Sequence, residues 1–273
     1  MLITDAAVLG LIQGITEFIP VSSSGHLLAA RMFFGISDDN GTAFDAFLHL
    51  GTLAAVLLYY WRVWWGIIRG FISSDDEARD RRELAGKLAL ATVPAAIIGY
   101  LFQDGLADRF RTPVTLAAGL LLTAFVLWWF DRVAHRQASV RDQTVGALDG
   151  SHRASYSDAL VIGFAQVIAL IPGVSRSGAT MGAARGRGMS RKQAASFSFL
   201  MSAPIIAGAG LASLGDLVGG ATFATNELLV GFIVSFVSGL IAIYVLLKLV
   251  EKMSFTPFVI YLILLAAAVL YVR

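Results

Sequence analysis

The chain has 273 residues, of which 57% are hydrophobic and only 15% are charged, and its mean hydropathy is +0.73. Soluble domains carry about 25% charged residues, so this composition predicts a polytopic membrane protein. The net charge of +2 is too small to indicate nucleic acid as a partner. The absence of cysteine excludes disulfides, thiolate metal sites and cysteine nucleophiles.

The first predicted elements are two short apolar segments, 2–18 and 27–34, separated by Pro20 and a turn rich in serine and glycine. Neither segment reaches the roughly 20 residues that a helix needs to cross a bilayer core. We therefore expect a re-entrant helix–loop–helix, because irregular backbone at membrane depth requires protein or a water-filled cavity around it. Gln13 and Glu17 are four residues apart, so they share one face of the first helix.

Three longer apolar segments follow, at 44–68, 84–102 and 115–130, and each is predicted to be a helix that crosses the membrane. Tryptophans and tyrosines gather near the ends of the first and third, as in the aromatic belts of membrane interfaces. The polar stretch 131–157 comes next, and about 134–154 is predicted to be a cytoplasmic linker between two halves.

The second half repeats this plan. Residues 159–171, a glycine-rich turn and the short apolar piece 181–184 predict a second re-entrant pair. Three further spans are predicted at 194–214, 228–250 and 258–272. The predicted fold class is an all-α polytopic membrane protein with six transmembrane helices and two re-entrant helix–loop–helix hairpins. It forms a single membrane domain, with repeat 1 at about 1–133 and repeat 2 at about 155–273. Three crossings is an odd number, so the second repeat is inverted.

The distribution of basic residues sets the expected orientation. One side of the membrane would receive Arg62, Arg69, Arg79, Arg81, Arg82, Lys87, Arg132, Arg136, Arg141, Arg153, Arg185, Arg187, Arg191, Lys192, Lys248 and Lys252. The other side would receive only Arg31, Arg109, Arg111 and Arg273. We therefore expect both termini to lie outside, with the two hairpin tips meeting near the midplane.

The two turns resemble each other. Ile19-Pro20-Val21-Ser22-Ser23-Ser24-Gly25-His26 aligns with 171–180 when Gly173 is treated as an insertion. Serine and glycine then coincide at three positions: Ser22 with Ser175, Ser24 with Ser177 and Gly25 with Gly178. Ser23 falls opposite Arg176. The alternative is two chance Ser/Gly loops, but the match favours a duplicated unit in which each copy carries half of one site.

Ionisable groups at membrane depth are costly, which makes Glu17 and Arg176 candidates for function. The alternatives are a packing role for Glu17 and a simple pair between the two. Gln13 and Glu17 are suited to a hard divalent cation, expected to be Mg²⁺ with Ca²⁺ as the alternative. Arg176 is suited to phosphate, since its planar fork matches phosphate oxygens.

Two residues compete for the nucleophile or base. A histidine ordinarily titrates near neutral pH, which suits His26 to either role, and Ser23 carries a hydroxyl, so the choice between them needs geometry. His49, on a long apolar segment, is expected to be a packing residue or to support the site indirectly. The residues as such fit either phosphoryl chemistry on a lipid-borne phosphate or anion transport.

At this point the sequence resembles a known family. Residues 13–26, with Gln13, Glu17 and the run Pro-Val-Ser-Ser-Ser-Gly-His, look like the (E/Q)xxxE and PVSSxGH motifs of undecaprenyl-diphosphate phosphatases of the bacitracin-resistance type. Residues 172–180, from Pro172 to Thr180, match the family's PGxSRSGxT motif. Gln13 stands where some members have Glu, which removes one negative charge and is expected to weaken metal binding.

The resemblance implies hydrolysis of undecaprenyl (polyprenyl) diphosphate to the monophosphate, which recycles the lipid carrier for cell-wall and surface glycan synthesis. By position, the catalytic residues would be Glu17, His26, Ser23 and Arg176, with Glu17 and Gln13 at the metal. The pyrophosphate would be bound by Ser22, Ser24, Gly25, Gly173, Ser175, Arg176, Ser177, Gly178 and Thr180. The resemblance also implies a plasma (inner) membrane protein whose site faces the extracytoplasmic side. Further expectations are a long-chain polyprenyl diphosphate and membrane lipids as partners, and a homodimer. The alternative function is a polyprenyl-phosphate flippase or an anion transporter.

Overall fold

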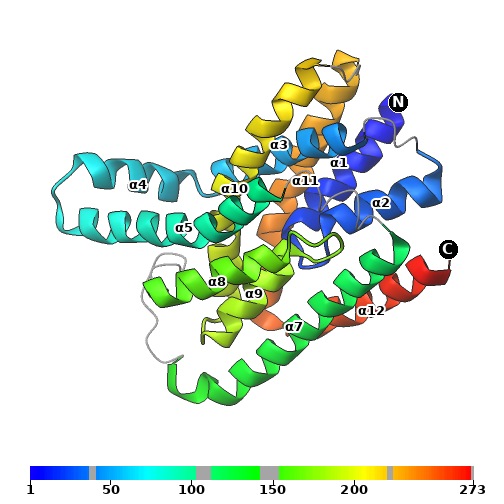
Figure 1. The fold of residues 1–273 in the computed structure, drawn as a ribbon. Coiled ribbons are helices and arrows are strands. Elements are labelled where there is room, and N and C mark those ends of the chain that lie inside the picture. Colours follow the sequence, from blue (N-terminus) through cyan, green and yellow to red (C-terminus); the bar gives the residue numbers. More distant parts are fainter. Residues whose placement is uncertain (37–40, 103–111, 142–153, 220–223, 272–273) are drawn as a thin grey trace.

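The computed structural model describes residues 1–36, 41–102, 112–141, 154–219 and 224–271, and within these ranges every regular element is an α-helix (Figure 1). The helices are α1 (Ile3–Phe18), α2 (Ser23–Phe34), α3 (Gly41–Tyr59), α4 (Trp61–Ile72), α5 (Asp76–Leu101), α7 (Pro113–Arg141), α8 (Tyr156–Ile168), α9 (Arg176–Gly186), α10 (Arg191–Gly219), α11 (Thr225–Lys252) and α12 (Thr256–Tyr271). Four basic residues used above to predict the orientation lie outside the described residues: Arg109, Arg111, Arg153 and Arg273.

The chain is a polytopic membrane protein by length and composition. Three described helices are long and apolar enough to cross a membrane, and a fourth span results if α3 and α4 count as one bent segment. α12 is an apolar helix of 16 residues and is shorter than these. α10 is not among the spans in the described part, and every residue from Ala194 to Ala203 is buried. A helix enclosed by protein does not need a lipid-facing apolar surface, so hydropathy is a weak guide to α10.

One predicted helix is wrong. The segment 44–68 is two helices, α3 and α4, whose axes meet at 72°. The break falls at Tyr60, which is buried and donates its hydroxyl to Ser196 Oγ at 3.2 Å. Beyond it, α4 carries exposed Trp61 and Trp65 and the basic Arg62. Such an amphipathic helix is suited to a membrane interface. After the turn at Tyr60, α4 and the start of α5 extend beyond the bundle (Figure 1).

The short helices of each half pack against a long helix of the other half. α1 lies against α11, and α8 lies against α5. Glycines allow this approach: a Cβ at Gly14 would come 1.9 Å from Ser238 Oγ, and one at Gly163 would come 2.6 Å from the carbonyl oxygen of Ala91. This exchange of partners is what an inverted repeat would produce, and the repeat itself stays a prediction.

The predicted linker begins later than expected. α7 continues through 134–141, and the remaining linker residues 142–153 lie outside the described part. Asp131, placed in the polar stretch by the sequence, is buried and accepts hydrogen bonds from Arg185 Nε at 3.0 Å and Arg191 Nε at 2.9 Å. These contacts tie the end of α7 to α9 and α10, so the charge belongs to the fold and not to a solvated loop.

Candidate active site

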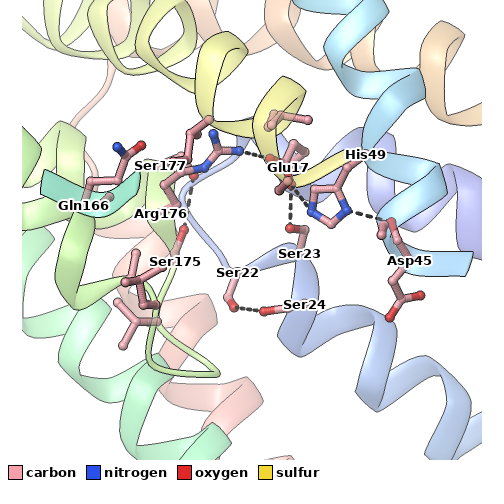
Figure 2. A pocket seen from close by; sticks show the side chains of 18 of the residues that line it. Glu17, Ser22, Ser23, Ser24, Asp45, His49, Gln166, Ser175, Arg176 and Ser177 are labelled. Carbon is pink, nitrogen blue, oxygen red and sulfur yellow. Dashed lines mark hydrogen bonds and ion pairs between the residues drawn. The ribbon is translucent and has the colours of Figure 1, made fainter. Parts of the chain in front are cut away.

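A cavity of about 360 Å³ lies where the two short-helix pairs meet (Figure 2). It is lined by the break between α1 and α2, the start of α9, and parts of α3, α5, α8 and α10. Its polar lining is Glu17, Ser22, Ser23, Ser24, Asp45, His49, Gln166, Ser175, Arg176 and Ser177. Residues from both halves of the chain therefore line one cavity, and that this cavity is the functional site stays a prediction.

Both serine motifs begin a helix instead of forming an extended turn. Ser22 is the N-cap of α2 and accepts from the N–H of Gly25 at 3.4 Å, and Ser175 is the N-cap of α9 and accepts from the N–H of Gly178 at 3.1 Å. The predicted helices 27–34 and 181–184 therefore start too late, because a serine N-cap starts the helix within the motif. Two helix N-termini consequently face the cavity, and their free N–H groups and dipoles favour an anion there.

Glu17 is the most heavily contacted side chain in the cavity. Its side chain is 2% exposed and pairs through Oε1 with the guanidinium of Arg176. Its Oε2 accepts from Ser23 Oγ at 2.6 Å and from Gln13 Nε2 at 3.0 Å. A carboxylate buried at this depth is costly unless paired, and Arg176 with these donors provides the pairing.

Arg176 links the two halves of the chain through one of its terminal nitrogens and leaves the other without a hydrogen bond in the described part of the chain. Nη2 bonds Glu17, while Nη1 is buried and has no hydrogen-bond partner among the described residues. Next to it, Ser177 Oγ donates to the carbonyl oxygen of Ile19 at 3.1 Å, which fastens the start of α9 to the end of α1. Arg176 is therefore held in place with one N–H edge available to a ligand.

His26 and His49 lie in different surroundings. His26 is not in the cavity lining: its Nδ1 donates to the carbonyl oxygen of Ser22 at 2.7 Å, and its Nε2 accepts from the Tyr261 hydroxyl at 2.6 Å. The two rings stack with centroids 5.6 Å apart. His49 does line the cavity, with Nε2 3.5 Å from Glu17 Oε2 and Nδ1 donating to the carbonyl oxygen of Asp45 at 2.7 Å. His49 therefore faces the site directly, more than the sequence suggested.

The comparison with known proteins identifies the family of this chain. The family model described as bacitracin resistance protein BacA matches residues 6–268. The chain belongs to the BacA family. It is also 41% identical over 267 residues to a protein named undecaprenyl-diphosphatase 2 from Stutzerimonas stutzeri (strain A1501), covering 96% of this chain and 95% of that protein. The family predicted from the two motifs is confirmed.

Several of the BacA-motif residues predicted to bind pyrophosphate support the backbone instead of lining the cavity. Gly173 has φ +91°, and a Cβ there would come 2.6 Å from the carbonyl oxygen of Leu116. Cβ atoms at Gly25 and Gly178 would press on side chains of α7, 2.9 Å from Leu116 Cδ1 and 2.4 Å from Thr123 Cγ2. Thr180 is buried and shares a hydrogen bond of 2.7 Å with Ser198. These residues let α2 and α9 pack tightly enough on neighbouring helices to bring their first turns together.

The fit of a divalent cation depends on Glu17 and Gln13. In the described part of the chain, no cluster of three or more His, Cys, Asp or Glu is placed to hold a metal. The cavity's other carboxylate, Asp45, is paired with Arg31 at 2.7 Å. Gln13 donates its amide nitrogen to Glu17 and leaves a buried Oε1 without a partner among the described residues. Mg²⁺ needs few protein ligands when phosphate supplies the others. Gln13 is not among the residues that line the cavity, so a cation held by Glu17 and Gln13 stays a prediction.

Asp45, His49 and Gln166 also line the cavity, although the sequence did not mark them as site residues. Asp45 and His49 are one turn apart on α3, and only the folding of α3 over α1 brings them to Glu17. Gln166 had a signal, because it precedes its proline at nearly the same distance as Gln13 precedes Pro20. If the two units are duplicates, Gln13 and Gln166 are expected in equivalent places at the site.

Proposed function

We propose that the protein is an integral membrane phosphatase that hydrolyses a long-chain polyprenyl diphosphate to the monophosphate and inorganic phosphate. Membership of the BacA family and the similarity to a protein named undecaprenyl-diphosphatase 2 support the substrate class. The observation that carries the proposal is that Ser23, Glu17 and Arg176 meet in one cavity inside a membrane protein. Product monophosphate returns to the pool of lipid carrier for cell-wall and surface glycan synthesis.

Ser23 is the nucleophile in this proposal. Its hydroxyl donates to Glu17 Oε2 at 2.6 Å, which is the distance expected of a nucleophile and its base. Ser23 Oγ attacks the terminal phosphorus as its proton passes to Glu17, and the bond to the bridging oxygen breaks so that lipid monophosphate leaves. Glu17 passes this proton to the bridging oxygen as the monophosphate leaves and is a carboxylate again. Water then attacks the phosphoserine and gives one proton to Glu17, which returns it to Ser23 Oγ as the bond from Ser23 to phosphorus breaks and inorganic phosphate is released.

Charge stabilisation comes from both halves of the chain. The buried Nη1 of Arg176 and the first N–H groups of α2 and α9 are directed toward the negative charge that develops on the phosphoryl oxygens. Such donors are fixed before the reaction and do not reorganise during it, which is why they usually supply most of the rate enhancement.

We further propose that the diphosphate binds together with a divalent cation held by Glu17 and Gln13. When bound, the cation supplies positive charge that neutralises the phosphate oxygens. Because the ion pair with Glu17 holds Arg176 in place, Arg176 can orient the diphosphate headgroup with or without the cation bound. The site faces the outer side of a plasma membrane in this proposal, and the prenyl tail leaves between helices into the lipid.

The test is phosphate release from a long-chain prenyl diphosphate by purified, detergent-solubilised protein, with Mg²⁺ and with a chelator. We expect one phosphate per lipid, lost in Ser23→Ala and Glu17→Gln. A folded protein that releases none would contradict the phosphatase proposal and would direct the next measurement to lipid flipping in vesicles, the alternative function. Activity that persists in chelator would contradict the cation proposal alone.

A further inference from the structure

Two buried polar atoms of opposite character line the cavity without a partner among the described residues. One is the donor Nη1 of Arg176, and the other is the acceptor Oε1 of Gln166, a residue that is 2% exposed. Arg176 is drawn between Gln166 and Glu17 in Figure 2. The phosphatase chemistry proposed above uses the Arg176 group but gives no role to Gln166.

A hydrogen bond from the amide nitrogen of Gln166 fixes which way the amide group points. Its Nε2 donates to the carbonyl oxygen of Ala91 at 3.4 Å, and turning the amide over would set two oxygens against each other. Gly163, nearly one helical turn earlier, holds α8 so close to α5 that a Cβ would come 2.6 Å from the same carbonyl oxygen. The atom of Gln166 without a partner is therefore the oxygen, so Gln166 can accept a hydrogen bond from a ligand but cannot donate one.

An acceptor and an arginine together require a ligand that carries both an anionic oxygen and a donor hydrogen. A terminal phosphate with one proton has both, since its P–O⁻ accepts from Arg176 and its P–OH donates to Gln166. A terminal phosphate esterified to a further group has no P–OH. It would leave Oε1 buried and unpaired, and sites built around a hydrogen bond reject ligands that lack the matching group.

From this we infer that Gln166 is a specificity-determining residue that accepts a hydrogen bond from the P–OH of a free terminal phosphate. It thereby selects an unsubstituted prenyl diphosphate against one whose terminal phosphate carries an ester, such as a sugar-loaded carrier. This inference rests on the proposed phosphatase function. It gives the second half of the chain a role in choosing the substrate in addition to binding charge.

The experiment compares kcat/KM for farnesyl diphosphate and for its methyl ester on the terminal phosphate, in the wild type, Gln166→Leu and Gln193→Leu. Gln193 is a matched amide that caps α10 by accepting from the N–H of Ser190 at 2.8 Å and does not line the cavity. We expect Gln166→Leu to reduce the preference for the free diphosphate by about tenfold or more, chiefly through KM, because one discriminating hydrogen bond is lost. Gln193→Leu should keep the wild-type preference. An unchanged preference in folded Gln166→Leu would overturn the inference.

The pH dependence of KM separates a contact from a structural role. Phosphate monoesters lose their last proton near a pKa of about 6, so the P–OH disappears as the pH rises through that region. KM of the wild type should therefore rise across it, while KM of Gln166→Leu should change less. Should Gln166→Leu not fold, Gln166→Asn withdraws the oxygen by one methylene and should show the same loss, and identical pH profiles would count against the inference. If the wild type releases no phosphate from farnesyl or longer diphosphates, the proposed function fails and the inference falls with it. If only the preference is unchanged, the function stands.

Discussion

Ser23 Oγ donates a hydrogen bond of 2.6 Å to Glu17 Oε2 across the break between α1 and α2. The two residues are six positions apart, so the break, and not a helical repeat, brings them together. His26, only three residues further on, is turned to Tyr261 and does not line the cavity. Geometry thus favours Ser23 over His26 as the attacking group.

A phosphoenzyme would identify that group directly. We expect a reaction quenched in acid after milliseconds to contain phosphoserine in the peptide that carries Ser23, because phosphoserine survives acid and phosphohistidine does not. Glu17→Gln should lower turnover by about 10²–10⁴-fold, the usual contribution of a general base. Phosphate found on His26 would refute the assignment. Ser24→Ala, which changes a neighbouring hydroxyl of the lining, is the comparison for the loss caused by Ser23→Ala.

Arg176 should not be replaceable by lysine. Lysine keeps the positive charge that Glu17 needs but has no second N–H edge for a ligand. We expect Arg176→Lys to lower kcat by about 10²–10³-fold, as for loss of one preorganised donor, with little change in the melting temperature. Arg187→Lys is the matched control, since Arg187 pairs with Asp158 at 2.6 Å and neither residue lines the cavity. Equal losses in the two variants would contradict a specific role for the Arg176 fork.

Gly173 should be sensitive to a single methyl group. An alanine there must adopt φ +91° and would press against the Leu116 carbonyl, so Gly173→Ala should destabilise the protein by more than the ~1–3 kcal/mol of the backbone strain alone. Gly35 is the control, because it has φ +64° but nothing within 4 Å of its would-be Cβ. Thermal unfolding in detergent measures both. Equal shifts would show that the approach to Leu116 costs nothing.

Sidedness can be measured with single cysteines, since the chain has none. Ser24→Cys and Ser177→Cys lie in the cavity lining, and Ser74→Cys lies in the connection between α4 and α5. In intact cells, we expect a membrane-impermeant maleimide to label the first two and to spare the third. Labelling of the cavity positions from both sides would instead favour the transport alternative, which needs two accessible states.

The sequence by itself determined the class of protein and the family, and it marked Glu17, Arg176 and the pair Ser23 and His26 as candidates for the site. Composition shows a membrane protein because lipid-facing helices need apolar side chains along their whole length. The motifs around Glu17, Ser23 and Arg176 specify chemistry because those residue types are costly at membrane depth without a use.

Only the tertiary structure decided which polar residues meet. The Tyr60 hydroxyl at the bend between α3 and α4 finds its partner, Ser196, far along the chain, and Asp131 is likewise buried against Arg185 and Arg191. The directions of His26 and His49 are likewise set by Tyr261 and Glu17 on other helices. A side chain's local sequence fixes its place on a helix face, but what that face touches follows from how the helices pack.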